Sequence, residues 1–220
     1  MIFEAENDRI PFFSQYFSAL ILIANILVFF WQLTDPTGRM YADVAAFIPA
    51  EFFAGQKLWT IFTSMFMHAD IVHIFMNMWF FYVIADNCEY SLGHGLFLFT
   101  YLISGICGSL LHAASTLFIP VFGPIMASIP SLGASGAIFG LMAVYGILFP
   151  KNRFYLPSKY GVRRIPALYF IMIYFISELI YGFFYSQISG TAHFAHIGGF
   201  IAGAIIALIF KGIKRKKTST

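Results

Sequence analysis

The chain has 220 residues, of which 60% are hydrophobic, 20% aromatic and only 10% charged. A soluble globular domain has about 25% charged residues, so this composition excludes a soluble enzyme or binding domain and indicates a polytopic membrane protein. The formal net charge of +3 does not predict a nucleic-acid partner, because the excess of Lys and Arg lies in two short segments beside apolar runs, at 151–164 and 211–217.

Six apolar runs organise the chain. Five have about 18 to 25 residues, the length that a helix needs to cross a hydrocarbon core of about 30 Å. They cover residues 16–33, 61–85, 96–118, 165–185 and 193–210, and a shorter sixth run covers residues 135–149. The first run has no basic leader or small-residue cleavage site, so we expect a retained helix there. The runs predict an all-α membrane domain of six transmembrane helices over residues 16–210, between a short N-terminal segment, 1–15, and a basic tail, 211–220.

The basic segments predict an orientation. Cytoplasmic loops collect Lys and Arg, and the two basic segments are separated by two spans, so both can lie on the cytoplasmic side. Counting back through six spans places both termini in the cytoplasm. The loops at 35–58, 119–132 and 186–191 are then outside, and the loop at 86–95 is inside.

Polar residues gather in the outer parts of three spans on this map. The span at 61–85 carries His68, His73 and Asn77 in its outer half, the span at 135–149 begins with Ser135, and the last span begins with His193 and His196. Ionisable groups inside spans are costly and usually functional. Their common depth predicts one site near the outer face.

Ser135 is the candidate nucleophile of this site. It stands in a Gly-x-Ser-Gly pattern at the start of the shortest run, and a serine hydroxyl needs a base, usually histidine, to take its proton. His196 is favoured over His193, which lies three residues nearer the membrane interface and is expected to be structural or solvated. Taken alone, Ser135 also fits a packing residue in a small-residue helix face.

Two glycine pairs predict how the serine and the histidine meet. Gly199 and Gly203 follow His196 at i+3 and i+7, on the same helix face. Gly136 and Gly140 have the same four-residue spacing in the span that begins with the candidate nucleophile. Faces of small residues allow membrane helices to approach closely. We therefore expect the two faces to pack together and to bring the serine within reach of His196.

His73 and Asn77 are candidates for an oxyanion hole. They are i, i+4 partners and share one face of their helix. Hydrogen-bond donors opposite a nucleophile stabilise the oxyanion of an acyl-transfer intermediate, an effect of about 10²- to 10³-fold per donor. The backbone N–H groups of Ala134 and Ser135, at the N-terminal end of a helix, can add to the same hole.

The short run predicts a water-filled cavity. Residues 135–149 measure about 22 Å as a helix, which is less than the hydrocarbon core of about 30 Å. Pro150 and the basic segment fix the inner end, so the outer end lies below the outer surface. The preceding segment, 119–133, holds three prolines and two glycines. Irregular backbone at that depth must be buried in protein or line a cavity with water, which a hydrolase needs as its second substrate.

These motifs resemble a known family. The matching residues are Gly133-Ala134-Ser135-Gly136, Ala195-His196 with Gly199 and Gly203, and His68, His73 and Asn77. In this order and on these spans, they resemble the rhomboid intramembrane serine proteases of the basic six-span bacterial type. The resemblance covers about residues 16–210. It implies a six-helix rhomboid-like bundle in the bacterial inner (plasma) membrane, an active site open to the outer face, and transmembrane proteins as substrates.

The resemblance also implies a role for each residue of the site. Ser135 would be the nucleophile and His196 the general base of a dyad without a carboxylate. His73, Asn77 and the Ser135 backbone would form the oxyanion hole. Hydrolysis would need no cofactor, and no phosphate-binding glycine motif occurs in the sequence.

Supporting positions follow from the same resemblance. Phe139 takes the place of an aromatic ring that lies against the catalytic histidine, and Glu89 resembles a glutamate that ties helices together. The loop at 35–58 would lie partly in the outer leaflet. One departure is Trp59-Thr60, where the family often has Trp-Arg, and it affects the contacts that usually stabilise this loop.

Glu178 lies inside the run at 165–185, at a depth similar to that of His196. A carboxylate within a span is expensive. Because the family precedent is a dyad, a polar contact or a cavity-facing role is preferred for Glu178 over a third place in the catalytic set.

Other histidines receive simpler interpretations. A zinc site at His193 and His196 is not expected, because the sequence has no HExxH motif and no third ligand is evident. His68 is expected to fix a loop by hydrogen bonding, since it is on another helix face from the oxyanion-hole candidates. No role is assigned to His94 or His112.

Two other functions compete with the protease. A rhomboid-like protein that only binds and retains membrane clients has the same fold but usually lacks the serine or the histidine, and this chain has both. A transporter or channel needs a polar route through the inner half of the bundle as well. The inner halves of the spans at 135–149 and 193–210 are apolar, which favours the protease.

Overall fold

The computed structural model describes residues 3–4, 12–35, 37, 39–118, 123–159, 161–185 and 190–218. Parts of several predicted segments lie outside the described residues: most of the N-terminal segment 1–15, residues 36 and 38 of the predicted outer loop at 35–58, and residues 119–122 and 186–189 of the other two predicted outer loops. The same holds for residues 219–220 of the basic tail.

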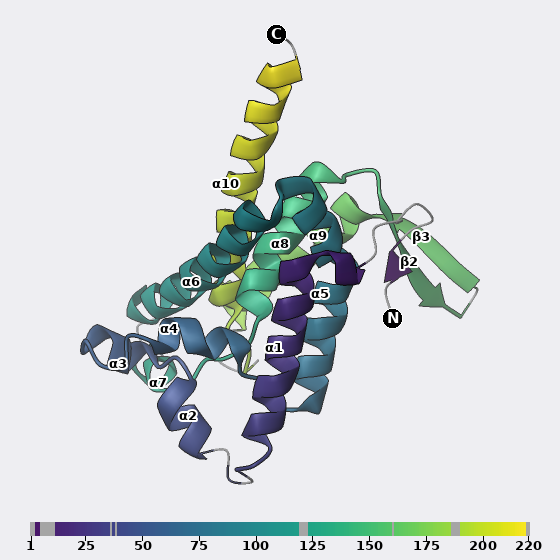
Figure 1. Cartoon of the computed structure of the whole chain (residues 1–220). Coiled ribbons are helices and arrows are strands. Elements are labelled where there is room, and N and C mark those ends of the chain that lie inside the picture. Colours follow the sequence, from purple (N-terminus) through teal and green to yellow (C-terminus); the bar gives the residue numbers. More distant parts are fainter. Residues whose placement is uncertain are drawn as a thin grey trace.

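Six apolar helices form a bundle, with short helices and a small sheet around it (Figure 1). They are α1 (Tyr16–Gln32), α5 (Ile71–Leu92), α6 (His94–Phe118), α8 (Ser135–Leu148), α9 (Ala167–Phe184) and α10 (His193–Thr218). By length and composition, α5, α6, α9 and residues 193–216 of α10 can each cross a membrane, and α1 and α8 are shorter apolar helices. The protein is therefore a helical polytopic membrane bundle, as predicted, with four helices of full spanning length in the described part of the chain.

The predicted span at 61–85 is wrong at its outer end. Residues 60–66 form two short turns, α4 (Thr60–Thr63) and the 3₁₀ helix η2 (Ser64–Phe66), and α5 begins only at Ile71. Asp70 caps α5, since its backbone is extended and its Oδ1 accepts the His73 N–H at 2.8 Å. A capping side chain satisfies one of the free N–H groups of a helix start. The helix therefore begins after Asp70, although the apolar run continues across it.

The same prediction is wrong at its inner end. α5 continues through residues 86–92, so the predicted inner loop at 86–95 is mostly helix, and α6 begins already at His94. The polar residues that suggested a loop are buried in the bundle: Asp86, Asn87 and Glu89. Buried polar groups need hydrogen-bond partners. The hydropathy of the sequence does not reveal such partners, so this part of the helix was predicted as a loop.

Glu89 ties the inner end of α5 to the start of α1, as the resemblance implied. Its carboxylate accepts the N–H groups of Phe17 and Ser18 at 3.0 and 2.7 Å, and also the Ser18 hydroxyl at 2.7 Å. The first N–H groups of a helix lack partners within the helix and favour a negative charge. Glu89 also contacts Nδ1 of His94 at 2.5 Å. One carboxylate thus joins three helices.

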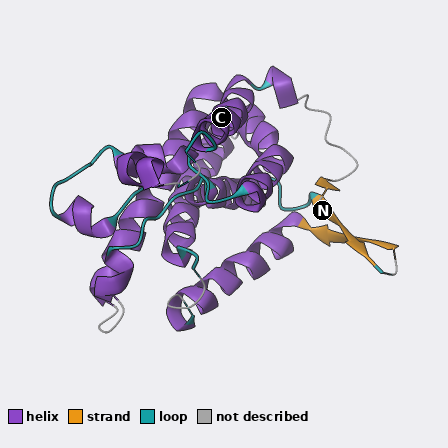
Figure 2. Ribbon diagram, turned by 90° about the horizontal axis from the view of Figure 1, so that it is seen from below, coloured by secondary structure: helices purple, strands orange, loops and turns teal. Residues whose placement is uncertain are grey.

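A three-stranded antiparallel sheet, which the sequence did not predict, lies at the edge of the bundle (Figure 2). β2 (Arg153–Ser158) and β3 (Gly161–Pro166) form a hairpin with Phe154 opposite Ile165, and β1 (Phe3–Glu4) adds to β2. Phe154 is fully buried and stacks on Tyr145 of α8. The basic residues of this segment made the strands hard to predict from the sequence. Phe154 anchors the hairpin to α8.

The remaining elements are short. They are η1 (Phe12–Ser14), α2 (Arg39–Ala45), α3 (Pro49–Phe53) and α7 (Gly123–Ala127). The segments around α3 and α7 are joined by a two-bond bridge, in which Phe47 and Ser131 exchange N–H···O bonds of 2.9 and 2.7 Å. The predicted outer loop at 35–58 is therefore folded and is attached to the segment that precedes α8.

α8 is the centre of the bundle, packed against α5, α6, α9 and α10, and residues 136–146 are all buried. Its contact with α10 is made by backbone. A Cβ atom added to Gly199 would meet the carbonyl oxygen of Gly136, and one added to Gly203 would meet the carbonyl oxygen of Gly140. The predicted glycine faces therefore pack together, at a distance that only glycine allows.

We predict that Gly203→Ala destabilises the protein, because the new methyl group must push α10 away from α8, and such overpacking costs about 1–3 kcal/mol. Gly212→Ala, in the same helix, is the matched control, since nothing lies within 4 Å of its Cβ position. The control is expected to be neutral or to stabilise by up to about 1 kcal/mol. Thermal unfolding in detergent measures both, and equal melting temperatures would contradict the proposed close contact.

Candidate active site

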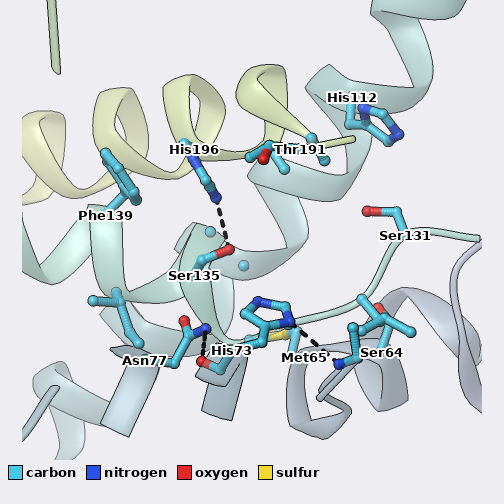
Figure 3. Close-up of a pocket in the computed structure, with 18 of the residues that line it drawn as sticks. Ser64, Met65, His73, Asn77, His112, Ser131, Ser135, Phe139, Thr191 and His196 are labelled. Carbon is cyan, nitrogen blue, oxygen red and sulfur yellow. Dashed lines mark hydrogen bonds between the residues drawn. The ribbon is translucent and has the colours of Figure 1, made fainter. Parts of the chain in front are cut away.

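A cavity of about 580 Å³ opens where α5, α8 and α10 begin. Its walls include the first turns of these three helices, one side of α6, and the segment from Met126 to Gly133. Ser135, His196, His73 and Asn77 face one another across it (Figure 3). The predicted site residues, which come from three separate spans, are therefore together in one place.

Ser135 and His196 are in direct contact. His196 Nε2 lies 2.7 Å from Ser135 Oγ, within the range of an ordinary hydrogen bond. Ser135 is the first residue of α8 and His196 is in the first turn of α10. The glycine contact between the two helices begins at Gly136, the residue after Ser135, and at Gly199, three residues after His196, so the pair has the proximity that the sequence predicted.

Phe139 lies flat against the ring of His196. The two ring centroids are 4.3 Å apart and the planes are inclined by only 7°. Phe139 is one turn after Ser135 on the same helix, so α8 supplies both the hydroxyl and the surface on which the imidazole rests. The predicted aromatic support is therefore present, and it restricts rotation of the histidine ring.

Glu178 contacts the other nitrogen of His196. Its Oε2 lies 2.8 Å from His196 Nδ1 and 2.6 Å from His193 Nδ1. An ionised carboxylate only accepts hydrogen bonds, so beside it the neutral imidazole of His196 is expected to carry its proton on Nδ1 and to present the lone pair of Nε2 to Ser135. The histidine is held in the tautomer that a general base requires.

Of the two alternatives preferred for Glu178, a polar contact or a cavity-facing role, the polar contact is the one found. Glu178 is 6% exposed and is not among the residues that line the cavity. The resemblance implied a dyad without a carboxylate, and it gave no sign of the contact between Glu178 and His196. His193 is buried against Glu178 and stacks near Tyr181, so its structural interpretation holds and the solvated one does not. The rotation of α9 about its axis decides these contacts, and it cannot be read from the α9 sequence alone.

The same three side chains have the composition of a metal site. One ligand atom from each of Glu178, His193 and His196 lies within 4.8 Å of the others. The expectation that the two histidines lack a third possible ligand is therefore wrong. The two N···O distances of 2.6 and 2.8 Å match hydrogen bonds, which favours an imidazole proton between each pair of atoms.

His73 presents a donor to the cavity. Its Nδ1 accepts the N–H of Ala69 at 3.2 Å, so in the neutral ring the proton is on Nε2. A Cβ atom added to Gly133 would lie 3.0 Å from Nε2 of His73 and 3.6 Å from Oγ of Ser135. The Nε2 edge of His73 and the hydroxyl of Ser135 thus flank the same point of the backbone.

Asn77 and the start of α8 provide further donors. Asn77 Nδ2 donates one hydrogen to the His73 carbonyl at 2.9 Å, and its amide has a second one. Ala134 is the N-cap residue of α8, and N–H groups in the first turn of a helix have no acceptor within the helix. His73, Asn77 and Ser135 line the same cavity, so the donors of these side chains and of the start of α8 lie around one space.

Family comparison agrees with this geometry. A family model described as the Rhomboid domain matches residues 55–212. The chain belongs to the rhomboid family. The match covers α4 to α10 and so includes every helix that contributes to the cavity.

Similar proteins include rhomboid proteases from distant organisms. The chain is 31% identical to the rhomboid protease GluP of Bacillus subtilis (strain 168) over 195 residues, 87% of this chain and 35% of that protein. It is 32% identical to the Rhomboid-like protease 3 of Toxoplasma gondii over 166 residues, 76% of this chain and 56% of that protein. It is 28% identical to the rhomboid protease AarA of Providencia stuartii over 212 residues, 86% of this chain and 70% of that protein. The chain thus spans about a third of GluP and a little over half of the Toxoplasma protein.

The rhomboid loop at 35–58 is stabilised by local bonds. Thr60, where an arginine was expected from the resemblance, is buried and donates its hydroxyl to the Lys57 carbonyl at 2.8 Å. Lys57 pairs with Glu51 at 2.9 Å, and the Trp59 indole donates to the Val44 carbonyl at 3.0 Å. The loop is therefore closed without the arginine.

His68 fixes a loop by hydrogen bonding, as predicted, but through its backbone and not through its ring. It lies in the loop before α5, and its backbone exchanges two hydrogen bonds with the Gln32 amide, each of 3.0 Å. Neither ring nitrogen has a hydrogen-bond partner among the described residues. Burial lowers the pKa of His68 to about 3, and the nearby ring of His73 acts in the same direction. The backbone fixes the loop, and the neutral ring fills space beside His73.

His112 is a site residue that the sequence did not single out. It is buried on α6 and lines the cavity, and its Nδ1 has no hydrogen-bond partner among the described residues. A histidine in an apolar helix is the one signal that pointed to it, since such residues in spans are usually functional.

We predict that Gly133→Ala lowers kcat while the fold persists, because its methyl group would lie 3.0 Å from the His73 ring and displace it. Gly161→Ala is the matched control. Both glycines have positive φ, 129° and 109°, so both variants carry backbone strain, but nothing lies near the Cβ position of Gly161. Steady-state cleavage of a transmembrane substrate compares them. Equal kcat values would show that Gly133 does not shape the site.

Proposed function

We propose that the protein is an intramembrane serine endopeptidase, which hydrolyses peptide bonds in or near the transmembrane segments of membrane proteins. The observation that carries the proposal is the 2.7 Å contact between Ser135 Oγ and His196 Nε2 inside a rhomboid-family bundle. A serine on an unperturbed helix is a weak nucleophile, and an adjacent general base is what activates it.

The first half of the reaction forms an acyl-enzyme. Ser135 Oγ attacks the carbonyl carbon of the substrate while its proton passes to His196 Nε2, and the carbonyl oxygen becomes an oxyanion. Collapse of this intermediate breaks the C–N bond. The leaving amine takes the proton from Nε2, and the acyl group remains as an ester on Ser135.

The second half uses water from the cavity. The water gives a proton to His196 Nε2 and its oxygen attacks the ester. The second tetrahedral intermediate then expels Ser135, which recovers its proton from Nε2, and the carboxyl product leaves. The cavity of about 580 Å³ has room for water beside the serine, and water needs polar partners of the kind that surround it.

The oxyanion hole lowers the barrier of both halves. Nε2–H of His73, the second amide hydrogen of Asn77 and the Ser135 backbone N–H are proposed to donate to the oxyanion. Each preorganised donor contributes about 10²- to 10³-fold to kcat, because the charge that it stabilises develops only in the transition state.

The geometry favours hydrolysis over the two competing functions. A client-binding protein has no need of a histidine that is oriented on both ring nitrogens and contacts a serine. A transporter needs a route beyond the site, and on α8 the residues that line the cavity end at Met142. The following residues, 143–146, are buried in the bundle.

We further propose that both termini are cytoplasmic and that the cavity opens toward the outer face of the bacterial inner membrane. The basic residues support this orientation. Lys211 donates to the Ile147 carbonyl at 3.0 Å, so the basic part of α10 lies beside the inner end of α8, at the opposite end from Ser135. Lys and Arg collect on the cytoplasmic side.

Ser135→Ala is expected to abolish both cleavage of a transmembrane substrate and labelling by a fluorophosphonate probe. His196→Ala should lower kcat by at least about 10³-fold, since nucleophile and base act as a unit. Ser177→Ala is the control, because the Ser177 hydroxyl bonds to the Tyr174 carbonyl of its own helix. Wild-type protein that resists the probe, or labelling that survives in Ser135→Ala, would refute the proposal.

Asn77→Ala is expected to reduce kcat by about 10²- to 10³-fold with little change in KM, because its donor acts on the oxyanion and not on the bound substrate. Labelling by the probe should slow in parallel, since the probe also forms a tetrahedral adduct. Turnover within about threefold of wild type would remove Asn77 from the hole.

A further inference from the structure

We propose that Glu178 is the positioning residue of a Ser135–His196–Glu178 triad, with His193 as the second support of its carboxylate. The inference rests on the proposed function, since it assigns a role in that reaction. It goes beyond the serine–histidine pair, because it makes activity depend on a carboxylate from α9.

The ring of His196 is held between two partners. Its two ring nitrogens face opposite partners, Nε2 toward Ser135 at 2.7 Å and Nδ1 toward Glu178 at 2.8 Å. Because Phe139 covers one face of the ring, the imidazole is restricted in rotation as well as in tautomer. Each contact alone is compatible with simple packing. Together they align a hydroxyl, an imidazole and a carboxylate in the order that proton transfer needs.

The charge that develops on His196 during the reaction also requires a partner. When His196 takes the proton from Ser135 it becomes a cation inside a helical bundle, where an isolated charge is costly. The carboxylate of Glu178 lies against Nδ1, and 7% of its side chain is exposed. A fixed negative charge at this distance stabilises the imidazolium and requires no reorganisation as the charge develops.

His193 explains how a carboxylate is tolerated at this depth. Its Nδ1 is 2.6 Å from the same Oε2 that contacts His196, so one carboxylate oxygen receives two N–H donors. The two histidines are three residues apart and therefore lie on one face of α10. Their rings are nearly perpendicular, at 87°. His193 thus holds Glu178 in place, while His196 remains available to Ser135.

A docking role for α9 is the competing explanation. Half of the residues of α9 are exposed, and its buried residues form a single stripe, made of Ala167, Ile171, Glu178 and Gly182. Glu178 therefore helps to attach α9 to α10. Docking, however, needs only a stable contact, whereas a triad needs the proton on Nδ1 of His196, and the two explanations differ in measurable ways.

The first experiment compares Glu178→Gln, Glu178→Asp and Glu89→Gln with the wild type, using cleavage of a transmembrane substrate. We expect Glu178→Gln to lower kcat by about 10²- to 10⁴-fold with KM nearly unchanged, because an amide fails to stabilise the imidazolium. Glu178→Asp should recover at least about tenfold of this loss, since the carboxylate is retained. Glu89→Gln is the matched control, a buried carboxylate at the far end of α5. It should lower the melting temperature and leave kcat within about threefold.

Two results of this comparison would overturn the inference. One is a Glu178→Gln protein that melts at a lower temperature but keeps its kcat within about threefold of the wild type, because Glu178 would then only dock α9. The other is loss of wild-type activity on addition of a chelator, because the three side chains would then hold a metal ion. Failure of the proposed function looks different: wild-type protein would neither cleave the substrate nor react with a fluorophosphonate.

A second measurement needs no variant at Glu178, and so remains decisive if Glu178→Gln does not fold. In wild-type protein labelled with ¹⁵N-histidine, NMR distinguishes protonated from unprotonated ring nitrogens. We expect the resonance that disappears in His196→Ala to report a protonated Nδ1 and an unprotonated Nε2. The opposite tautomer would overturn the inference, because Glu178 cannot donate to Nδ1.

Discussion

The contact on which the rest of the structure depends is the one between the backbones of α8 and α10. Gly136 and Gly140 present carbonyl oxygens to Gly199 and Gly203 at a separation that leaves no room for a methyl group. Because helices are stiff, this contact fixes the relative height of everything attached to them. Ser135 directly precedes Gly136, and His196 is three residues before Gly199, so backbone geometry holds the two side chains 2.7 Å apart. Neither needs a loop to bring it into place.

The other helices place the remaining groups of the site. α5 brings His73 and Asn77 to the cavity, and the Asp70 cap determines where that helix starts and therefore at which height its donors lie. At the opposite end, Glu89 attaches α5 to α1 through the free N–H groups of a helix start. Two carboxylates thus have opposite tasks. Glu89 joins helices far from the chemistry, and Glu178 contacts the candidate base.

Sequence reasoning succeeded where a local pattern carries the spatial information. Glycines at i, i+4 identify a contact face and its height, which is why the proximity of Ser135 and His196 could be predicted. It failed where the deciding partner is distant in the chain. The start of α5 depends on a cap within an apolar run, and the hairpin of β2 (Arg153–Ser158) and β3 (Gly161–Pro166) was hidden by its basic residues. Glu178 could be placed at the right depth, but its direction depends on how α9 is rotated, and only packing determines that.

The exposure of α9 has a consequence for the proton on His196. Only four of the 18 residues of this helix are buried and half are exposed, so a large part of its surface is available to lipid. A mismatch between such a helix and the bilayer costs fractions of a kcal/mol per Å and is relieved by movement of the helix or deformation of the bilayer. A movement of α9 that lengthens the 2.8 Å contact between Glu178 and His196 loosens the hold on one tautomer. The chain length of the lipids, a property of the solvent and not of the protein, then affects which nitrogen of His196 carries the proton.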